Sequence, residues 1–173
     1  SKAKNKIIET PFIGFFKNAT VNISHDLDAA CFAMYDGNPG ITCILGTGSN
    51  SCYYDGKEIY EHAPSLGFIM GDDASGNYFG KKILSLYFNG KMDQELKEKF
   101  ESSFESNIDV INKNVYNTNR ANVFLAQYFP FITVTRDHPI IQKLIKDTLD
   151  EFIDLHVKCL SLIHISEPTR RTP

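Results

Sequence analysis

The sequence contains no Cys-x-x-Cys pair, although it has four cysteines: Cys31, Cys43, Cys52 and Cys159. Without that spacing we expect neither a zinc site nor an iron–sulfur site. No apolar run approaches the roughly 20 residues of a membrane-spanning helix. The apolar stretch after the basic N-terminal residues is too broken for a secretory signal. These absences predict a cytoplasmic protein with free thiols and no membrane partner.

Basic residues are too scattered to mark a nucleic-acid-binding surface. The net charge is −3 and no basic stripe is present, so no nucleic-acid partner is expected. The histidines His62, His138 and His156 show no metal-ligand spacing. The 173 residues are 42% hydrophobic and 23% charged, which is typical of one ordinary globular domain or two small ones.

Both ends of the sequence have the features of cut points. The chain begins at Ser1 without methionine, and "LSLIHISEPTR" from Leu160 to Arg170 resembles a translated sequencing-library adapter. We therefore expect residues 160–173 to be a non-native tail and the rest to be an internal piece of a longer protein. Alone, such a piece is expected to be poorly stable and to lack activity.

The pattern of apolar residues and turn residues predicts an α/β chain. We expect helix within 2–16, a short strand at 19–24, a helix at 25–35 and a buried strand at 41–45. A β-meander follows, with Asp55-Gly56 as its second turn. A helix then opens at "GDDASGNYFGKKILSLYF", and residues 91–159 are helical with breaks near Pro130 and Pro139.

The first turn of the meander, in "CILGTGSNSCYYDG", carries two glycines and two hydroxyls. Gly46 and Gly48 let backbone amides approach a ligand, while Thr47 and Ser49 add hydroxyl donors. This combination suits a phosphate, although a plain hairpin turn would use the same residues. Symmetric pairing about the turn would place Cys43 opposite Cys52.

Carboxylates stand at two further element ends. Asp26 lies at the predicted junction of a strand and a helix, and Asp72 and Asp73 lie at another helix start. In open α/β sheets ligands gather at such ends, so the three polar sites are expected to meet. Helix capping is the alternative role for Asp26 and for Asp72.

Three segments together resemble one family: "SHDLDAA", "PGITCILGTGSNSCYYDG" and "LGFIMGDDASGNYFGKKIL". They resemble the BadF/BadG/BcrA/BcrD-type ATPases, and within that family the N-acetylglucosamine kinases of the sugar kinase, Hsp70 and actin superfamily. The resemblance is strongest over residues 19–88. It implies an incomplete ribonuclease H-like (actin-like ATPase) fold, with a phosphate-binding hairpin and a helical C-terminal half. Residues 1–39 would end the first domain and residues 40–159 would form part of the second.

The resemblance also implies roles for individual residues. Gly46, Thr47, Gly48 and Ser49 would form the second phosphate loop. Asp26 would be the catalytic base, with Asp28 as its rival, and Asp72 would bind sugar hydroxyls. ATP and Mg²⁺ are implied, but the first phosphate loop and the adenosine motif are absent, so no metal ligand is assigned. Ala74 and Asp73 stand where glycine and glutamate are commoner.

The function that this resemblance implies is ATP-dependent phosphorylation of an amino sugar, such as N-acetylglucosamine, at its 6-hydroxyl. The partners would be a sugar and a nucleotide, and a homodimer is compatible with the sequence. The enzyme alternative is the activator ATPase of a 2-hydroxyacyl-CoA dehydratase. It would carry a cluster-bridging cysteine that residues 64–80 lack. A non-catalytic sugar- or nucleotide-sensing domain is the third reading, and the retained Asp26 and Asp72 argue against it.

Overall fold

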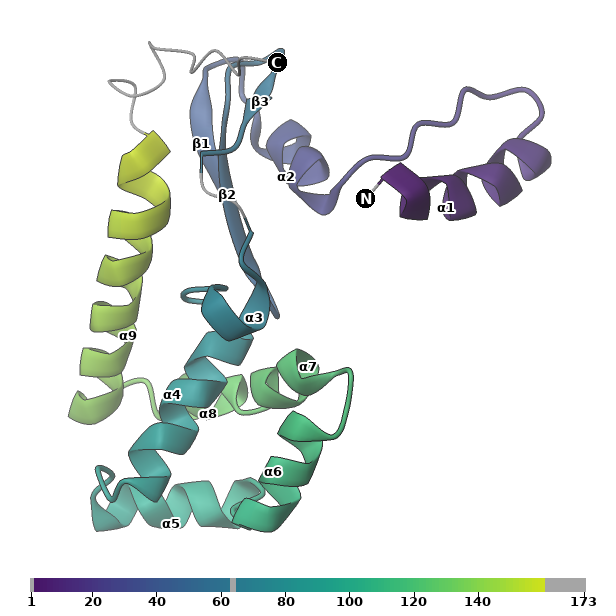
Figure 1. Ribbon diagram of the computed structural model, residues 1–173. Coiled ribbons are helices and arrows are strands. Elements are labelled where there is room, and N and C mark those ends of the chain that lie inside the picture. The colour runs from purple at the N-terminus through teal and green to yellow at the C-terminus, as the bar shows by residue number, and fades with distance from the viewer. Residues whose placement is uncertain (1, 63–64, 161–173) are drawn as a thin grey trace.

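The computed structural model describes residues 2–62 and 65–160, as a mixed α/β chain (Figure 1). Its elements, in order, are α1 (Lys2–Phe15), α2 (Asp26–Met34), β1 (Gly40–Leu45), β2 (Ser49–Tyr54), β3 (Ile59–Tyr60), α3 (Gly67–Met70), α4 (Gly76–Phe88), α5 (Gln94–Ser103), α6 (Ile108–Tyr116), α7 (Ala121–Ala126), α8 (Phe129–Val134), α9 (Pro139–Phe152), the π-helical η1 (Ile153–Val157) and the 3₁₀ turn η2 (Lys158–Leu160). Within those ranges, no helix is both long and apolar enough to cross a bilayer. The expected tail lies outside the described residues except for Leu160, which is buried.

The N-terminal region departs from the sequence prediction at one element. Helix α1 forms despite Pro11 and leaves apolar side chains such as Ile7 and Phe15 exposed. Residues 19–24, predicted as a strand, have no regular structure. A strand is stabilised only where a neighbouring strand accepts its hydrogen bonds. Among the described residues none pairs with this segment, so its β-branched residues do not suffice.

Helix α2 covers one face of the three-stranded antiparallel sheet, which has the order β1-β2-β3. Leu27 and Cys31 of α2 pack with Cys52 and Tyr54 of β2, and these four side chains are buried. The predicted helix at 25–35 is therefore confirmed, and its buried face explains why it forms. The expected domain boundary after residue 39 stays a prediction.

The register of the hairpin differs from the symmetric pairing expected from the sequence. Leu45 pairs with Ser49, so the loop holds three residues rather than two, and Cys43 faces Ser51. Cys52 faces Thr42 instead. A shift of one residue moves a side chain to the other face of the sheet. Cys43 is accordingly exposed, whereas Cys52 is buried beneath α2.

Strand β1 is more exposed than its apolar sequence predicts. Ile41 and Leu45 are 38% and 48% exposed, so the prediction of a buried strand at 41–45 is wrong. The strand lies at the edge of the sheet, and α2 covers only the face that carries Thr42 and Ile44. The alternate side chains of β1, including Ile41 and Leu45, point to the other face of the sheet, which α2 does not cover.

The second turn of the meander forms at Asp55-Gly56, as predicted. Gly56 has φ 94°, and a Cβ there would lie 2.3 Å from the hydroxyl of Tyr35. The carboxylate of Asp55 accepts the backbone N–H groups of Lys57 and Glu58 at 2.7 Å each. Strand β3 is nevertheless only two residues long, shorter than the predicted segment.

The helical half encloses the larger core. Fully buried side chains of α4, α5, α8 and α9 meet there, among them Ile83, Phe100, Phe131 and Ile141. Helices α4 and α7 approach so closely that a Cβ on Gly80 would lie 1.9 Å from the carbonyl oxygen of Leu125. The breaks predicted near Pro130 and Pro139 are confirmed, because each proline lies in the first turn of a new helix.

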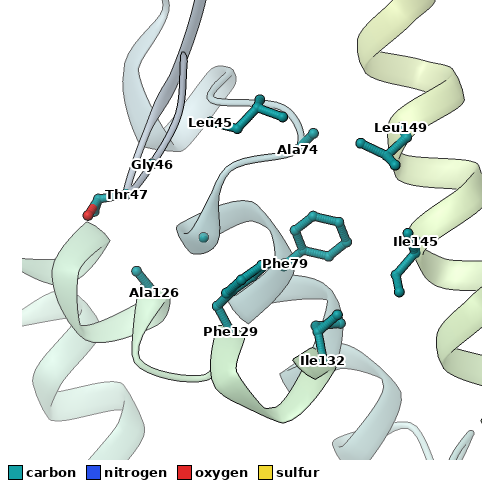
Figure 2. A pocket seen from close by; sticks show the side chains of 11 residues that line it. Leu45, Gly46, Thr47, Ala74, Phe79, Ala126, Phe129, Ile132, Ile145 and Leu149 are labelled. Carbon is teal, nitrogen blue, oxygen red and sulfur yellow. The ribbon is translucent and has the colours of Figure 1, made fainter. Parts of the chain in front are cut away.

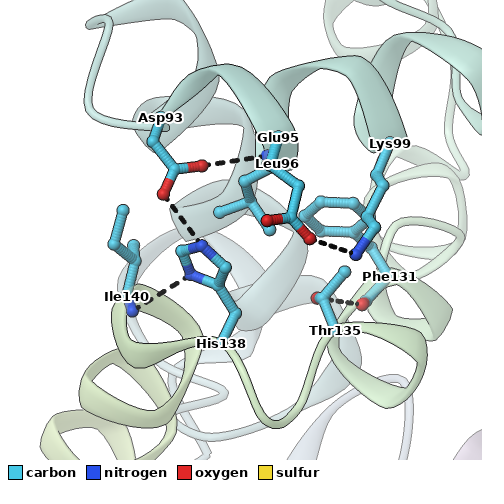
Figure 3. A network of polar contacts seen from close by, with 8 residues as sticks. All are labelled: Asp93, Glu95, Leu96, Lys99, Phe131, Thr135, His138 and Ile140. Carbon is cyan, nitrogen blue, oxygen red and sulfur yellow. Dashed lines mark hydrogen bonds and ion pairs between the residues drawn. The ribbon is translucent and has the colours of Figure 1, made fainter.

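The N-cap residues of α5 and α9, Asp93 and His138, contact each other (Figure 3). Asp93 accepts the N–H of Leu96 at the start of α5, and His138 Nδ1 accepts the N–H of Ile140 at the start of α9. His138 Nε2 lies 2.9 Å from the other carboxylate oxygen of Asp93. One pair thus satisfies donors of two helices and fixes α9 against α5.

Candidate functional site

The β1–β2 loop, residues 46–48, is a tight turn tied to the start of α4. Gly46 N–H donates to the carbonyl oxygen of Gly48 at 2.9 Å. The carbonyl oxygens of Gly46 and Thr47 accept the N–H groups of Gly76 and Asn77 at 2.7 and 3.2 Å. The loop is therefore held by backbone bonds to the first turn of α4, and its position depends on that helix.

The segment from Asp72 to Ser75 leads into α4 through a strained turn. Asp72 and Ala74 have φ 58° and 59°, which non-glycine residues adopt only where the surroundings enforce it. Ser75 is fully buried and caps α4 by accepting the N–H of Tyr78 at 3.3 Å. Because Ser75 supplies the cap, the carboxylate of Asp72 is available for another role.

Asp72 packs directly against the Gly46–Ser49 loop, which is the candidate phosphate loop. A Cβ placed on Gly48 would lie 3.0 to 3.1 Å from the carboxylate atoms of Asp72, whereas one on Gly46 would meet nothing closer than 3.9 Å. The second glycine of the loop is thus the one that the close approach requires. Neither glycine has a positive φ, so the requirement is steric space rather than backbone conformation.

Asn77 connects the two segments and was missed in the sequence. Its side-chain amide nitrogen donates to the carbonyl oxygen of Thr47 at 2.6 Å and to Asp72 Oδ2 at 2.9 Å. The side chain is fully buried, and its amide oxygen has no partner among the described residues. Sequence spacing gives no sign of this role, because Asn77 looks like an ordinary polar residue in a helix start.

One polar pocket brings together the residues expected to act as base, phosphate loop and sugar ligand. Its volume is about 450 Å³, and Asp26, the Gly46–Ser49 loop and Asp72 line it, together with Ile44, Asn50 and Ser65. Asp26 comes from the start of α2, whereas Asp72 comes from the turn before α4. The predicted meeting of three element ends therefore occurs, while the chemical role of each residue remains a prediction.

The two candidate bases on α2 differ in their surroundings. Asp28 accepts the N–H of His25 at 3.2 Å and the hydroxyl of Ser24, so its carboxylate closes the first turn of the helix. The carboxylate of Asp26 accepts the N–H of the neighbouring Leu27 at 3.0 Å, and Asp26 is exposed in the pocket. The geometry therefore favours Asp26 for contact with a ligand.

The loop fits a phosphate group in two respects. The hydroxyl oxygen of Ser49 is buried and has no hydrogen-bond partner within the described part of the chain. A donor of this kind is costly to bury unless something accepts from it. Thr47, whose side chain carries a second hydroxyl, also lines the polar pocket beside Ser49. The described residues offer no group of three or more His, Cys, Asp and Glu side chains that could hold a metal, so no ligand is assigned to Mg²⁺, which stays an expectation.

A cation lies near the carboxylates of the site. Lys81 donates to the carbonyl oxygen of Phe68 at 2.7 Å. Burial lowers the pKa of Lys81, and the carboxylates of Asp72 and Asp73 act in the opposite direction. Lys81 therefore contributes positive potential on the α4 side of the turn.

The other side of the loop is apolar (Figure 2). A second pocket of about 530 Å³ shares only Gly46 and Thr47 with the polar one. Its remaining walls come from Leu45, from α4 and the residues before it, and from α7, α8 and α9, including Phe79, Phe129 and Leu149 (Figure 2). The loop thus separates a pocket rich in carboxylates and hydroxyls from one lined by apolar side chains.

Comparison with solved structures identifies a similar protein. The chain is similar to the "Putative N-acetylglucosamine Kinase" of Porphyromonas gingivalis, with 32% sequence identity and a TM-score of 0.83. The similarity covers 90% of this chain and 56% of that one, so the chain spans little more than half the length of its relative. No protein-family model and no curated protein sequence matches the chain.

This similarity supports a sugar-kinase-like α/β fold and is compatible with an actin-like ATPase fold. Membership of the BadF/BadG/BcrA/BcrD-type ATPases stays an expectation from the motifs, because no family model matches.

Proposed function

We propose that this chain is the catalytic-cleft portion of an ATP-dependent kinase that phosphorylates an amino sugar such as N-acetylglucosamine at its 6-hydroxyl. The observation that carries the proposal is the single pocket lined by Asp26, the Gly46–Ser49 loop and Asp72. The similarity to a structure named as a "Putative N-acetylglucosamine Kinase" supports it.

In this proposal each residue performs one part of a phosphoryl transfer. Asp26 accepts the proton of the attacking sugar hydroxyl, as a general base does. The hydroxyls of Thr47 and Ser49 donate to phosphate oxygens and stabilise their charge. Asp72 accepts hydrogen bonds from sugar hydroxyls, and Asn77 holds it in place. ATP, when bound, supplies the transferred phosphoryl group.

In this proposal the apolar pocket on the far side of the loop takes the rest of the nucleotide. A purine ring packs on apolar and aromatic side chains, and Phe79 and Phe129 line this pocket. The phosphate chain would then run from the apolar pocket past Thr47 toward the polar one. This arrangement would place the nucleotide and the sugar on opposite sides of the same loop.

The test is sugar-dependent ADP release by the longest natural polypeptide that contains residues 1–159 of this sequence, called the parent protein below. The proposal predicts release with N-acetylglucosamine and little release without sugar. Equal release with and without sugar would reject it. The activator-ATPase alternative predicts instead sugar-independent release and visible absorbance from a bound iron–sulfur cluster.

A further inference from the structure

The end of the last helix contacts the candidate site through His156, to which the sequence pattern assigned no role. His156 belongs to η1, the π-helical turn that continues α9. Its Nε2 lies 2.8 Å from Asp73 Oδ2, and the two side chains are only 19% and 16% exposed. Asp73 lies between Asp72 and Ala74, so this contact holds the central residue of the strained turn.

Further contacts fix the imidazole in place. The hydroxyl of Ser51 donates to the carbonyl oxygen of His156 at 2.8 Å, which ties η1 to the sheet. The ring stacks on Phe152 with a centroid distance of 5.0 Å. One helical turn earlier, Glu151 accepts the hydroxyl of Tyr78 at 2.6 Å. The end of α9 is therefore bound to β2, to the turn and to α4 at once.

The geometry also places His156 beside the candidate site itself. A small cavity of about 30 Å³ is lined by Ser49, Asn50, Asp72, Asp73 and His156, among others. Ser49, Asn50 and Asp72 also line the polar pocket. The contact between His156 and Asp73 thus forms the wall behind the residues expected to meet the ligand. π-Helical turns of this kind occur frequently at functional sites.

We propose that His156 is a positioning residue for the sugar site. By holding Asp73, it keeps its two neighbours, Asp72 and Ala74, in their left-handed conformation and so keeps the carboxylate of Asp72 against Gly48. Without this contact the turn relaxes toward ordinary backbone angles, and Asp72 moves away from the loop. The part that concerns the sugar rests on the proposed function.

The experiment compares three variants of the parent protein. His156→Ala removes the contact, and His156→Gln keeps an N–H donor of similar reach. Lys158→Ala is the matched control, since Lys158 is exposed two residues further along the chain and forms its ion pair with Asp154, away from Asp73. Asp73→Ala tests the contact from its other side if His156→Ala does not fold.

The first readout needs no enzymatic activity. Hydrogen exchange of the peptide that spans residues 71–76 is expected to become about tenfold faster in His156→Ala. It should remain near the unmodified rate in His156→Gln and Lys158→Ala. Exchange in α5 serves as the internal reference and should not change. Unchanged exchange at 71–76 in both His156→Ala and Asp73→Ala would overturn the proposal.

The second readout separates positioning from general damage. In His156→Ala the KM for the sugar is expected to rise about tenfold while the KM for ATP stays within about twofold. His156→Gln should restore most of the sugar KM. A parallel rise of both KM values would overturn the proposal. If the unmodified protein shows no sugar-dependent ADP release, the proposed function fails, and the exchange result alone then decides whether His156 holds the turn.

Discussion

The side-chain amide of Asn77 donates a 2.9 Å hydrogen bond to the carboxylate of Asp72. The same nitrogen lies 2.6 Å from the carbonyl oxygen of Thr47, so a single buried group joins the phosphate-loop candidate to the sugar-site candidate. Asn77 is fully buried, and water cannot replace it without a change in packing. This relationship makes the two halves of the pocket depend on each other.

Asn77→Ala is expected to remove two part-buried hydrogen bonds, to the carbonyl oxygen of Thr47 and to the carboxylate of Asp72. A hydrogen bond of this kind typically contributes about 0.5–1.5 kcal/mol to the free energy of unfolding. We expect denaturant unfolding to show a loss of that size, and the sugar-dependent kcat/KM of the parent protein to fall as Asp72 moves. Asn114→Ala, on the exposed face of α6, is the control and should alter neither quantity. Equal stability of Asn77→Ala and the unmodified protein would contradict the linking role.

The two aspartates of α2 are expected to respond differently to amidation. Asp26→Asn should lower turnover of the parent protein by about 10²–10⁴-fold, because a general base is lost, with nucleotide affinity little changed. Asp28→Asn should instead weaken the first turn of α2, since Asp28 accepts from Ser24 and His25. Steady-state kinetics and nucleotide titration measure both effects. Near-normal turnover in Asp26→Asn would exclude it as the base and favour Asp28.

The two loop glycines, Gly46 and Gly48, can be compared by the same substitution to alanine. Gly48→Ala would place a methyl group 3.0 to 3.1 Å from the carboxylate of Asp72, so one of the two must shift. Gly46→Ala would meet open space. We therefore expect Gly48→Ala to raise the sugar KM of the parent protein about tenfold or more and Gly46→Ala to have a much smaller effect. The reverse order would show that Asp72 does not pack on the loop.

The Asp93–His138 pair predicts a pH dependence of stability (Figure 3). The pKa of Asp93 lies below its usual value, chiefly because the carboxylate accepts the N–H of Leu96 and also because His138 is near. A lowered folded-state pKa gives stability above the ordinary carboxyl pKa, and this stability is lost as the pH falls through the folded-state pKa.

Asp93→Ala should therefore lower the melting temperature at neutral pH. The difference from the unmodified protein should shrink as the pH falls below the ordinary carboxyl pKa and the carboxyl of Asp93 becomes protonated. Asp137→Ala removes a carboxylate that is 92% exposed and should change little. A difference that stayed constant from neutral to acid pH would show that the ionised carboxylate is not what stabilises the cap.

The cysteines are expected to react in the order of their burial. Cys31 Sγ lies 3.1 Å from Cys52 Sγ, and both thiols are buried, whereas Cys43 is exposed. Burial raises the pKa of Cys52, and the contact with Cys31 raises it further, so less thiolate forms. Alkylation of the native protein should therefore modify Cys43 before Cys31 and Cys52, as mass spectrometry can follow.

Free thiols are still expected in the cell. A Cys43–Cys52 disulfide in protein alkylated during lysis would contradict the sheet register, which puts the two side chains on opposite faces. It would also contradict a reducing compartment.

The sequence correctly predicted most of the helices and turns whose formation depends on one segment of the chain alone. The helix at Asp26–Met34, the turn at Asp55-Gly56 and the helix starts at the two prolines follow from spacing and residue type. The strand at 19–24 failed because a strand also needs a partner, and the sequence of one segment does not supply it. The hairpin register failed because a loop of two residues and one of three residues look alike in sequence.

The sequence predicted residues that line the candidate site, but not the residues that hold them in position. Motifs and element ends indicated the residues that line the polar pocket. The contacts that hold them join distant positions, such as Asn77 with Thr47 and His156 with Asp73. No periodicity or spacing encodes a contact between residues 83 positions apart. Such residues are visible only once the chain is folded.

The central claim is that the pocket transfers a phosphoryl group to a sugar. The most direct measurement is phosphorus NMR of the products that the parent protein forms from ATP and N-acetylglucosamine, with Asp26→Asn measured beside it. The account predicts a sugar 6-phosphate formed in equal amount to ADP, and almost none with Asp26→Asn. Formation of inorganic phosphate alone, at the same rate with and without the sugar, would contradict it.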